Sequence, residues 1–154
     1  MPDGPLPSAA GERAEFETVI LNLAGNARDA MAECREGGEI RIALAPVAID
    51  APGNDDLPAD VVLAQGRYLR VTVSDTGVGM SPEVLARVGE AFFTTKPVGQ
   101  GTGLGLSLAR RFAITAGGAL HLASTPGAGT TVTLWLREAL RERIDARAEA
   151  PATA

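Results

Sequence analysis

Most of the glycines in this 154-residue chain fall into short clusters, and these clusters constrain the fold more than any other feature. Glycine adopts backbone angles that other residues avoid, so a cluster ends a helix or forms a tight turn. Gly37-Gly38 and Gly117-Gly118 each follow a stretch of helical periodicity, whereas Gly77 and Gly127 lie in turns that follow strand-like stretches. The clusters therefore divide the chain into short elements joined by close turns.

Hydrophobic periodicity between the clusters assigns these elements as helices or strands. Because helices and strands do not alternate regularly, a doubly wound parallel sheet is excluded. We expect instead an α/β (α+β) two-layer sandwich, with helices on one face of a mixed, mostly antiparallel sheet. The expected helices span residues 14–34, 81–90 and 104–116, and the expected strands span residues 39–45, 68–75, 119–124 and 130–136.

The same patterns give expectations about burial and domain boundaries. Ile40, Ile42 and Leu44 alternate along the first strand and are expected to face inward. The last helix carries apolar residues four apart, at Leu104, Leu108, Phe112 and Ala116. Residues 46–66 are an acidic, proline-broken loop that we expect to be a solvated insertion. The predicted divisions are a linker (1–12), one domain (13–137) and a polar C-terminal helix and tail (138–154).

Bulk composition excludes several classes of protein. The net charge of −5 argues against a nucleic-acid-binding protein, which would need a clustered basic face. No apolar run is long enough to cross a membrane, and the first residues do not resemble a secretory signal. A single cysteine, Cys34, excludes an internal disulfide and favours a reducing, cytoplasmic location. We interpret Cys34 as a small core residue.

A polar stripe runs along the first predicted helix. It consists of Asn22, Asn26, Asp29 and Glu33, whose spacing places them on one helical face beside the apolar one. Asparagine is a poor helix former, and a merely solvated face would favour Glu, Lys and Arg. The stripe is therefore either a solvated face or a binding surface, and the residues alone leave the two readings open.

The end of the strand at 68–75 carries a second polar feature. Asp75 continues the parity of the inward-facing valines, so its carboxylate lies on the core face, where a charge needs a partner. Gly77 and Gly79 follow and permit a close approach to the backbone. A buried acceptor of this kind suits an exocyclic amine such as that of adenine. The alternative is an aspartate that caps its own turn.

A glycine-rich run opens the last predicted helix. Free N–H groups at a helix start, with glycines beside them, form an anion site, and Lys96 upstream supplies a cation. The spacing matches neither the phosphate-binding loop of P-loop proteins nor the dinucleotide-binding fingerprint. The glycines concerned are Gly99, Gly101, Gly103 and Gly105.

The order and spacing of these pieces resemble the histidine-kinase branch of the superfamily that also contains gyrase and Hsp90. The N box of that branch corresponds to LNLAGNARDAM at 21–31, and the F box to FFTTK at 92–96. Three glycine boxes correspond to DTGVGM at 75–80, GTGLGLS at 101–107 and PGAGTTV at 126–132. The pairing of NARDAM with FFTTK is similar to the subgroup found in hybrid kinases. The resemblance covers residues 16–136.

This resemblance implies an ATP-binding catalytic domain with a bound magnesium ion. Asn26 matches the residue that ligates magnesium, Asn22 faces the phosphates, and Asp75 accepts from the adenine amine. Thr130 matches a hydroxyl that shares the water beside adenine. The implied catalytic residues are Asn22, Asn26 and Lys96. The further implied ATP-binding residues are Asp29, Gly77, Gly79, Met80, Thr95, Gly101, Thr102, Gly103, Leu104, Gly105 and Leu106.

Two departures from the best-known kinase pattern bear on the chemistry. Asp29 and Ala30 stand where many relatives carry a lysine and an aromatic residue, so the role of phosphate cation moves to Lys96. Asn22 stands where the ATPase branches carry a glutamate that activates water. An amide cannot act as a general base, which suits a kinase that must exclude water as the acceptor.

The implied partners are a histidine-bearing dimerisation domain and a response regulator or receiver domain, with no nucleic acid and no membrane contact. The isolated chain is expected to be a monomer. His121 lies on a predicted strand, and nothing around it resembles an acceptor box. Trp135 is expected to cover the outer sheet face. The alternative functions are a stand-alone serine kinase of the same superfamily and a degenerate module that binds nucleotide without catalysis.

Overall fold

The computed structural model describes residues 13–32, 34, 37–50, 57–87 and 105–139, and its elements follow the expected order. The strand β1 (Ile40–Ile49) is longer than expected and extends into the stretch predicted as a loop. Helix α1 (Arg13–Met31) ends three residues before Cys34, which is half-buried rather than a core residue. The elements are α1 (Arg13–Met31), β1 (Ile40–Ile49), β2 (Gly66–Asp75), α2 (Pro82–Arg87), α3 (Gly105–Thr115), β3 (Ala119–Thr125) and β4 (Gly129–Arg137).

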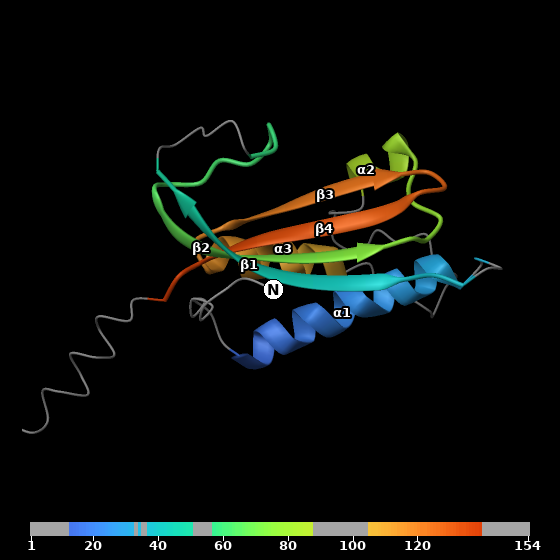
Figure 1. The fold of residues 1–154 in the computed structure, drawn as a ribbon, viewed down its shortest axis with the longest axis horizontal. Coiled ribbons are helices and arrows are strands. Elements are labelled where there is room, and N and C mark those ends of the chain that lie inside the picture. The colour runs from blue at the N-terminus through green and yellow to red at the C-terminus, as the bar shows by residue number, and fades with distance from the viewer. Residues whose placement is uncertain (1–12, 33, 35–36, 51–56, 88–104, 140–154) are drawn as a thin grey trace, which may run out of the picture.

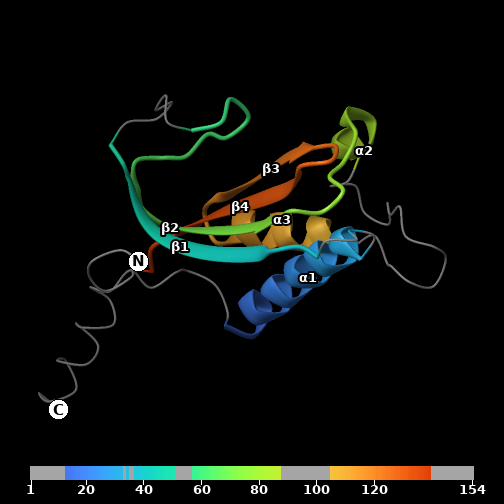
Figure 2. The same cartoon turned by 45° about the vertical axis from the view of Figure 1, so that its right-hand side comes forward.

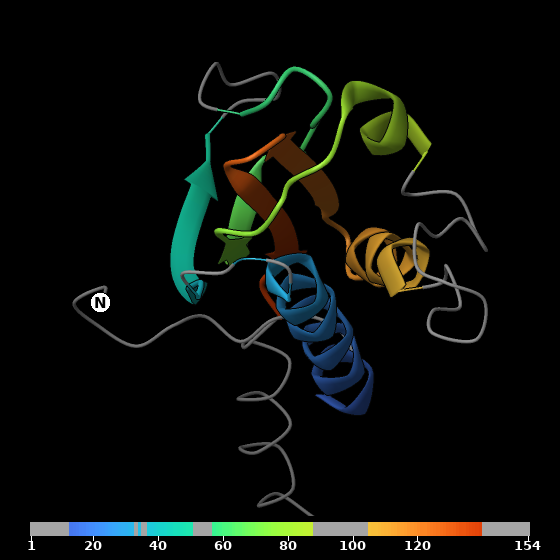
Figure 3. The ribbon, with the colours of Figure 1, turned by 90° about the vertical axis from the view of Figure 1, so that its right-hand side faces the viewer.

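The four strands form one sheet in the order β1-β2-β4-β3. Every pair of neighbouring strands in it is antiparallel, so the expected antiparallel character is confirmed. Helices α1 and α3 lie side by side on one face of the sheet (Figures 1 and 3). The short helix α2 lies beyond the end of β2, beside the turn that joins β3 to β4 (Figure 2). The predicted two-layer architecture is therefore confirmed.

The main core lies between the sheet and the two long helices. Val71 and Leu134 are fully buried at the centre of the sheet, and Leu23 of α1 and Phe112 of α3 pack over them. Burying a side chain of this size stabilises the fold by about 1.5–3 kcal/mol. Small residues at Ala109 and Ala113 bring α3 close to the sheet.

The expected burial of β1 is wrong, although its orientation is right. Ile42 and Leu44 pair with Val73 and Val71, so they share the helix-facing side of the sheet. Their exposed fractions are nevertheless 49% and 37%, and that of Ile40 is 37%. The reason is that β1 is an edge strand, and α1 packs mainly across β2. Among the described helices, none extends far enough to cover β1.

The burial expected for the apolar residues four apart in α3 also needs a correction. Phe112 and Ala116 are buried as expected, but Leu108 is 43% exposed. The buried stripe of the helix instead runs through Ala109 and Ala113, because the sheet lies nearer to that side. Leu108 faces the gap between α3 and α1. Leu104 lies outside the described residues.

A second, smaller core lies on the outer face of the sheet and corrects the expectation of a solvated insertion. Val61 and Leu63, within the predicted loop, are buried against Tyr68 and Trp135. The hydroxyl of Tyr68 donates to the carbonyl oxygen of Ala64 at 2.8 Å, which fixes the segment to β2. The expectation that Trp135 covers the outer face is confirmed.

His121 lies on this outer face as expected. It pairs with Thr133 across β3 and β4, and its Nδ1 lies 2.8 Å from Oδ1 of Asp60 in the insertion. This contact lacks hydrogen-bond geometry and is a close approach between the imidazole and the carboxylate. The histidine therefore faces away from the helices and from the glycine turns.

Replacing Leu63 tests whether the insertion is part of the fold. Leu63→Ala should lower the free energy of unfolding by about 2–4 kcal/mol, because it leaves a cavity beside Trp135. Val62→Ala is the matched control, since the side chain of Val62 is 76% exposed, and it should change stability by less than about 0.5 kcal/mol. Urea unfolding measures both values. Equal stability of the two variants would show that the insertion does not contribute to the core.

Candidate functional site

The sequence-predicted site residues that the structure describes gather at one end of the sheet. This end is formed by the C-terminal half of α1, the end of β2, the start of α3 and the start of β4 (right-hand side of Figure 1). At the start of α3 the first backbone N–H groups have no partner within their own helix, so they remain available to other groups. The site is therefore built as much from main-chain groups as from side chains.

Asp75 is the anchor of this region. Its Oδ1 accepts a hydrogen bond from the backbone N–H of Gly77 at 2.8 Å and another from the N–H of Thr130 at 3.3 Å. The first bond is a cap of the turn by its own aspartate, which was one of the two alternatives for Asp75. That alternative is correct for one of the two carboxylate oxygens. The second bond reaches across to β4. Asp75 is partly buried, as its parity with Val73 predicts.

The turn after Asp75 packs directly onto the end of α1. The backbone N–H of Val78 donates to the carbonyl oxygen of Ala30 at 3.0 Å. A Cβ atom on Gly77 would lie 2.6 Å from the same oxygen, so only glycine permits this approach. The C-terminal end of the helix that carries the polar stripe is thereby held against the turn that follows Asp75.

The third glycine box closes the other side of the same turn. The N–H of Gly127 donates to the carbonyl oxygen of Val78 at 2.7 Å. Gly79 has a φ of 70°, and a Cβ atom there would collide with the carbonyl group of Thr125. Gly129 has a φ of 113°, and a side chain there would collide with the carbonyl group of Asp75. Two glycine boxes that are distant in sequence therefore interlock through their backbones.

The two asparagines lie beside the start of α3. A Cβ atom on Gly105 would lie 3.5 Å from Nδ2 of Asn26 and 3.7 Å from Cβ of Asn22. Both asparagines are half-buried, so the stripe is not a freely solvated face. The first N–H groups of α3 have no partners within their own helix. Amide side chains and a helix N-terminus thus meet, as the resemblance implies for a phosphate site.

The remaining predicted residues divide into three groups. Asp29 lies on the same helix with its side chain 42% exposed, and its Oδ1 is 3.8 Å from Nε of Arg28. Leu106 is partly buried and packs against the main core at the start of α3. The others lie outside the described residues: Thr95, Lys96, Gly101, Thr102, Gly103 and Leu104.

Sequence reasoning did not identify Ser124, although it joins two of the glycine boxes. Its Oγ accepts from the backbone N–H of Met80 at 2.8 Å and lies 2.8 Å from Oγ1 of Thr130. Ser124 also donates to the carbonyl oxygen of Gly129 at 3.0 Å. The signal available in the sequence was its place opposite Thr130 in the β3–β4 hairpin. A lone serine near a strand end is too common to be singled out without that register.

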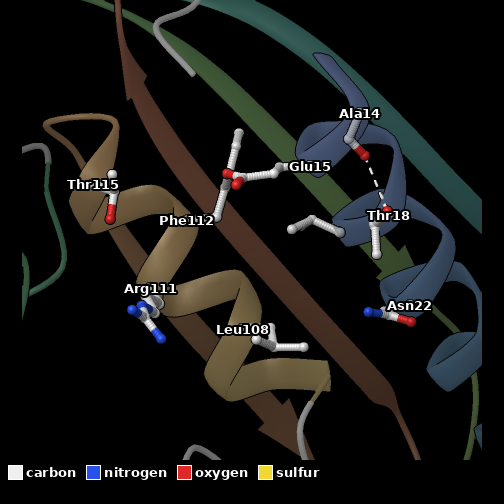
Figure 4. A pocket seen from close by; sticks show the side chains of 9 residues that line it. Ala14, Glu15, Thr18, Asn22, Leu108, Arg111, Phe112 and Thr115 are labelled. Atoms are coloured by element: carbon white, nitrogen blue, oxygen red, sulfur yellow. Dashed lines mark hydrogen bonds between the residues drawn. The ribbon is translucent and has the colours of Figure 1, made fainter. Parts of the chain in front are cut away.

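A groove of about 500 Å³ leads away from the site between α1 and α3 (Figure 4). Asn22 lies at its site end, and Leu108 and Phe112 contribute apolar surface from α3. Glu15 and Arg111 place one charge of each sign along its sides. The groove includes neither Asp75 nor Thr130, so it is a separate surface that adjoins the phosphate end of the site.

Comparison with known proteins adds to this geometry. Residues 11–140 match the model of the family described as histidine kinase-, DNA gyrase B-, and HSP90-like ATPase. The chain belongs to this family. It is 41% identical over 132 residues to the sensor kinase CckA of Brucella abortus, which covers 84% of the chain and 13% of that protein. It is 36% identical over 154 residues to the histidine protein kinase DivJ of Caulobacter vibrioides, covering 98% of the chain and 22% of that protein.

Solved structures of the family have the same fold. Full-length ShkA in complex with AMPPNP matches with a TM-score of 0.60 and 29% sequence identity, covering 88% of this chain and 24% of that one. The mycobacterial sensor histidine kinase MprB matches with a TM-score of 0.59 at 22% identity, over 84% of this chain and 76% of that one. The chain thus spans a small part of the curated relatives that it matches. Within the described residues, no helix has the length and apolarity of a membrane span.

Replacing Gly77 tests the contact between the glycine turn and α1. Gly77→Ala should lower the free energy of unfolding by about 1–3 kcal/mol, because the added carbon displaces the turn from the carbonyl of Ala30. Gly25→Ala is the matched control, since an added Cβ meets no neighbouring atom within 4 Å. It should raise stability by about 1 kcal/mol through helix propensity. A stabilised Gly77→Ala variant in urea unfolding would contradict the described packing.

Proposed function

We propose that this chain is the ATP-binding catalytic domain of a two-component sensor histidine kinase. The observation that carries the proposal is the meeting of Asn22 and Asn26 with Gly105 at the start of α3, beside an Asp75 held by two backbone N–H groups. One end of the site therefore suits phosphates and the other suits a base. Membership of the family and the similarity to named sensor kinases support the same conclusion.

Asp75 selects adenine in this proposal. Gly77 and Thr130 both donate to Oδ1, so within the described part of the chain the second carboxylate oxygen is left for a ligand. An acceptor at this point pairs with the exocyclic amine of adenine, directly or through one water. The carbonyl group of guanine at the same place would leave the acceptor unpaired, which costs about 1–3 kcal/mol.

The phosphate end suits a magnesium ion. Magnesium in nucleotide sites takes few protein ligands and is held largely by the phosphates and by water. Asn26 offers an amide oxygen of the preferred type, and its side chain lies next to the start of α3. When bound, the ion neutralises the charge that develops on the transferred phosphoryl group. Asn22, Asn26 and the helix N-terminus orient the phosphates, and we assign the further cation to Lys96.

Asn22 distinguishes a kinase from an ATPase in this arrangement. It is half-buried one helical turn before Asn26, on the side of α1 that faces α3. Its amide does not take a proton from water, so the site favours a nucleophile brought by another domain. The proposed nucleophile is a histidine on a dimerisation domain, from which a response regulator or receiver domain then takes the phosphoryl group. We place this domain in the cytoplasm as a monomer without contact to nucleic acid or membrane.

Asn26→Ala tests the magnesium assignment. The variant should bind magnesium-ATP about tenfold more weakly, because one oxygen ligand is lost, while metal-free ATP binding should change little. Asn26→Asp keeps an oxygen at the same place and should retain the magnesium dependence. Calorimetric titration with and without magnesium measures both effects. Equal losses in the two titrations would contradict the role of Asn26.

Labelling with γ-labelled ATP tests the proposed function as a whole. The chain alone should bind ATP but take up little label, because His121 faces the outer side of the sheet beside Asp60. Adding the histidine-bearing dimerisation domain of a similar kinase should produce label on that domain, stable to alkali and labile to acid. His121→Ala should behave like the unmodified chain. Strong label on the chain itself, or turnover like that of an ATPase, would overturn the proposal.

A further inference from the structure

Three polar side chains form a row across the strands at the site end of the sheet. Ser124 of β3 pairs with Thr130 of β4. Ser74 of β2 pairs with Thr131, and continuing this antiparallel register by one residue places Asp75 opposite Thr130. The next row on the same face of the sheet consists of Val73, Val132 and Leu122, which pack in the main core. The polar row therefore lies on the helix-facing side, where the site is.

Within the part of the chain that the structure describes, the hydroxyl of Ser124 has three polar neighbours. It accepts from the N–H of Met80, lies 3.0 Å from the carbonyl oxygen of Gly129, and lies 2.8 Å from Oγ1 of Thr130. A serine hydroxyl carries one proton and two acceptor positions. Gly129 can only accept through its carbonyl group, so it takes the serine proton. The remaining acceptor position of Ser124 then receives the proton of Thr130.

This assignment determines how Thr130 meets a ligand. With its proton directed at Ser124, Oγ1 of Thr130 presents lone pairs, and the neighbouring carboxylate of Asp75 presents an acceptor as well. The reverse assignment, in which Ser124 donates to Thr130, would leave the carbonyl oxygen of Gly129 beside an acceptor without a proton. Buried polar groups in that state are costly, so the first assignment is favoured.

We propose that Ser124 is a positioning residue that holds Thr130 as a hydrogen-bond acceptor and thereby strengthens selection of the adenine amine. This inference rests on the proposed function, because it takes Asp75 and Thr130 as the base end of an ATP site. The exocyclic amine has two protons to donate, so a site with two acceptors, Asp75 and Thr130, matches it better than a site with one. Ser124 itself does not touch the nucleotide and acts through Thr130.

The test compares ATP with purine riboside triphosphate, which differs from ATP only in lacking the amine. The 154-residue chain should prefer ATP, and the ratio of the two dissociation constants measures what the amine contributes. Thr130→Val should lower this preference about fivefold, the value of one hydrogen bond, and Ser124→Ala should lower it about two- to fivefold. Ser124→Thr, which keeps a hydroxyl, should retain the preference.

A double variant separates positioning from a general structural role. If Ser124 acts through Thr130, the variant with both Ser124→Ala and Thr130→Val should lose no more preference than Thr130→Val alone. A structural role would instead weaken both nucleotides equally and leave their ratio unchanged. Additive losses of preference, or an unchanged ratio in Ser124→Ala, would overturn the inference.

Three further outcomes complete the test, and the last two keep this inference distinct from the proposed function. If Ser124→Ala does not fold, as judged by thermal unfolding, the result for Ser124→Thr decides, and loss of preference in that variant would overturn the inference. Failure of the unmodified chain to bind ATP would overturn the proposed function and this inference together. Normal ATP binding by the unmodified chain, with no effect of Thr130→Val on preference, would overturn this inference alone.

Discussion

The two backbone N–H groups that converge on Oδ1 of Asp75 hold together parts of the chain that are far apart in sequence. The bond from Gly77 shapes the turn that packs on α1, and the bond from Thr130 ties the same carboxylate to β4. A charged acceptor with two donors forms stronger bonds than neutral pairs do. The glycine turn and the start of β4 are therefore both tied to one carboxylate oxygen, and α1 is tied to the same turn through the carbonyl oxygen of Ala30.

The fold was largely predictable because its periodicity is regular. The order of helices and strands, the outward face of His121 and the burial of Val71 and Val73 all follow from spacing alone. The spacing of apolar residues does not show how far a neighbouring helix extends over the sheet. It therefore placed Ile42 correctly on the helix-facing side of the sheet but wrongly predicted that the side chain is buried. Similarly, the acidic composition of the insertion concealed Val61 and Leu63, whose burial depends on Tyr68 and Trp135 elsewhere in the chain.

The candidate site could be predicted where glycine or asparagine occurs at an unfavourable position. Asn22 and Asn26 are poor helix formers. Gly77 is needed because a side chain there would collide with the carbonyl oxygen of Ala30. Such residues are visible in a sequence because their local cost needs an explanation. Ser124 has no local cost in a strand end, and its importance arises only from register across β3 and β4. Residues of this kind become evident only in the folded arrangement.

The small core on the outer face has a consequence for how other proteins approach this domain. Tyr68 and Trp135 lie toward the end of the sheet that is distant from Asp75, and the insertion covers them there. A visiting protein domain therefore contacts the insertion rather than the strands in that region. On the opposite face of the sheet, the groove between α1 and α3 opens beside Asn22. The insertion in this way makes the two faces of the sheet different surfaces for a partner.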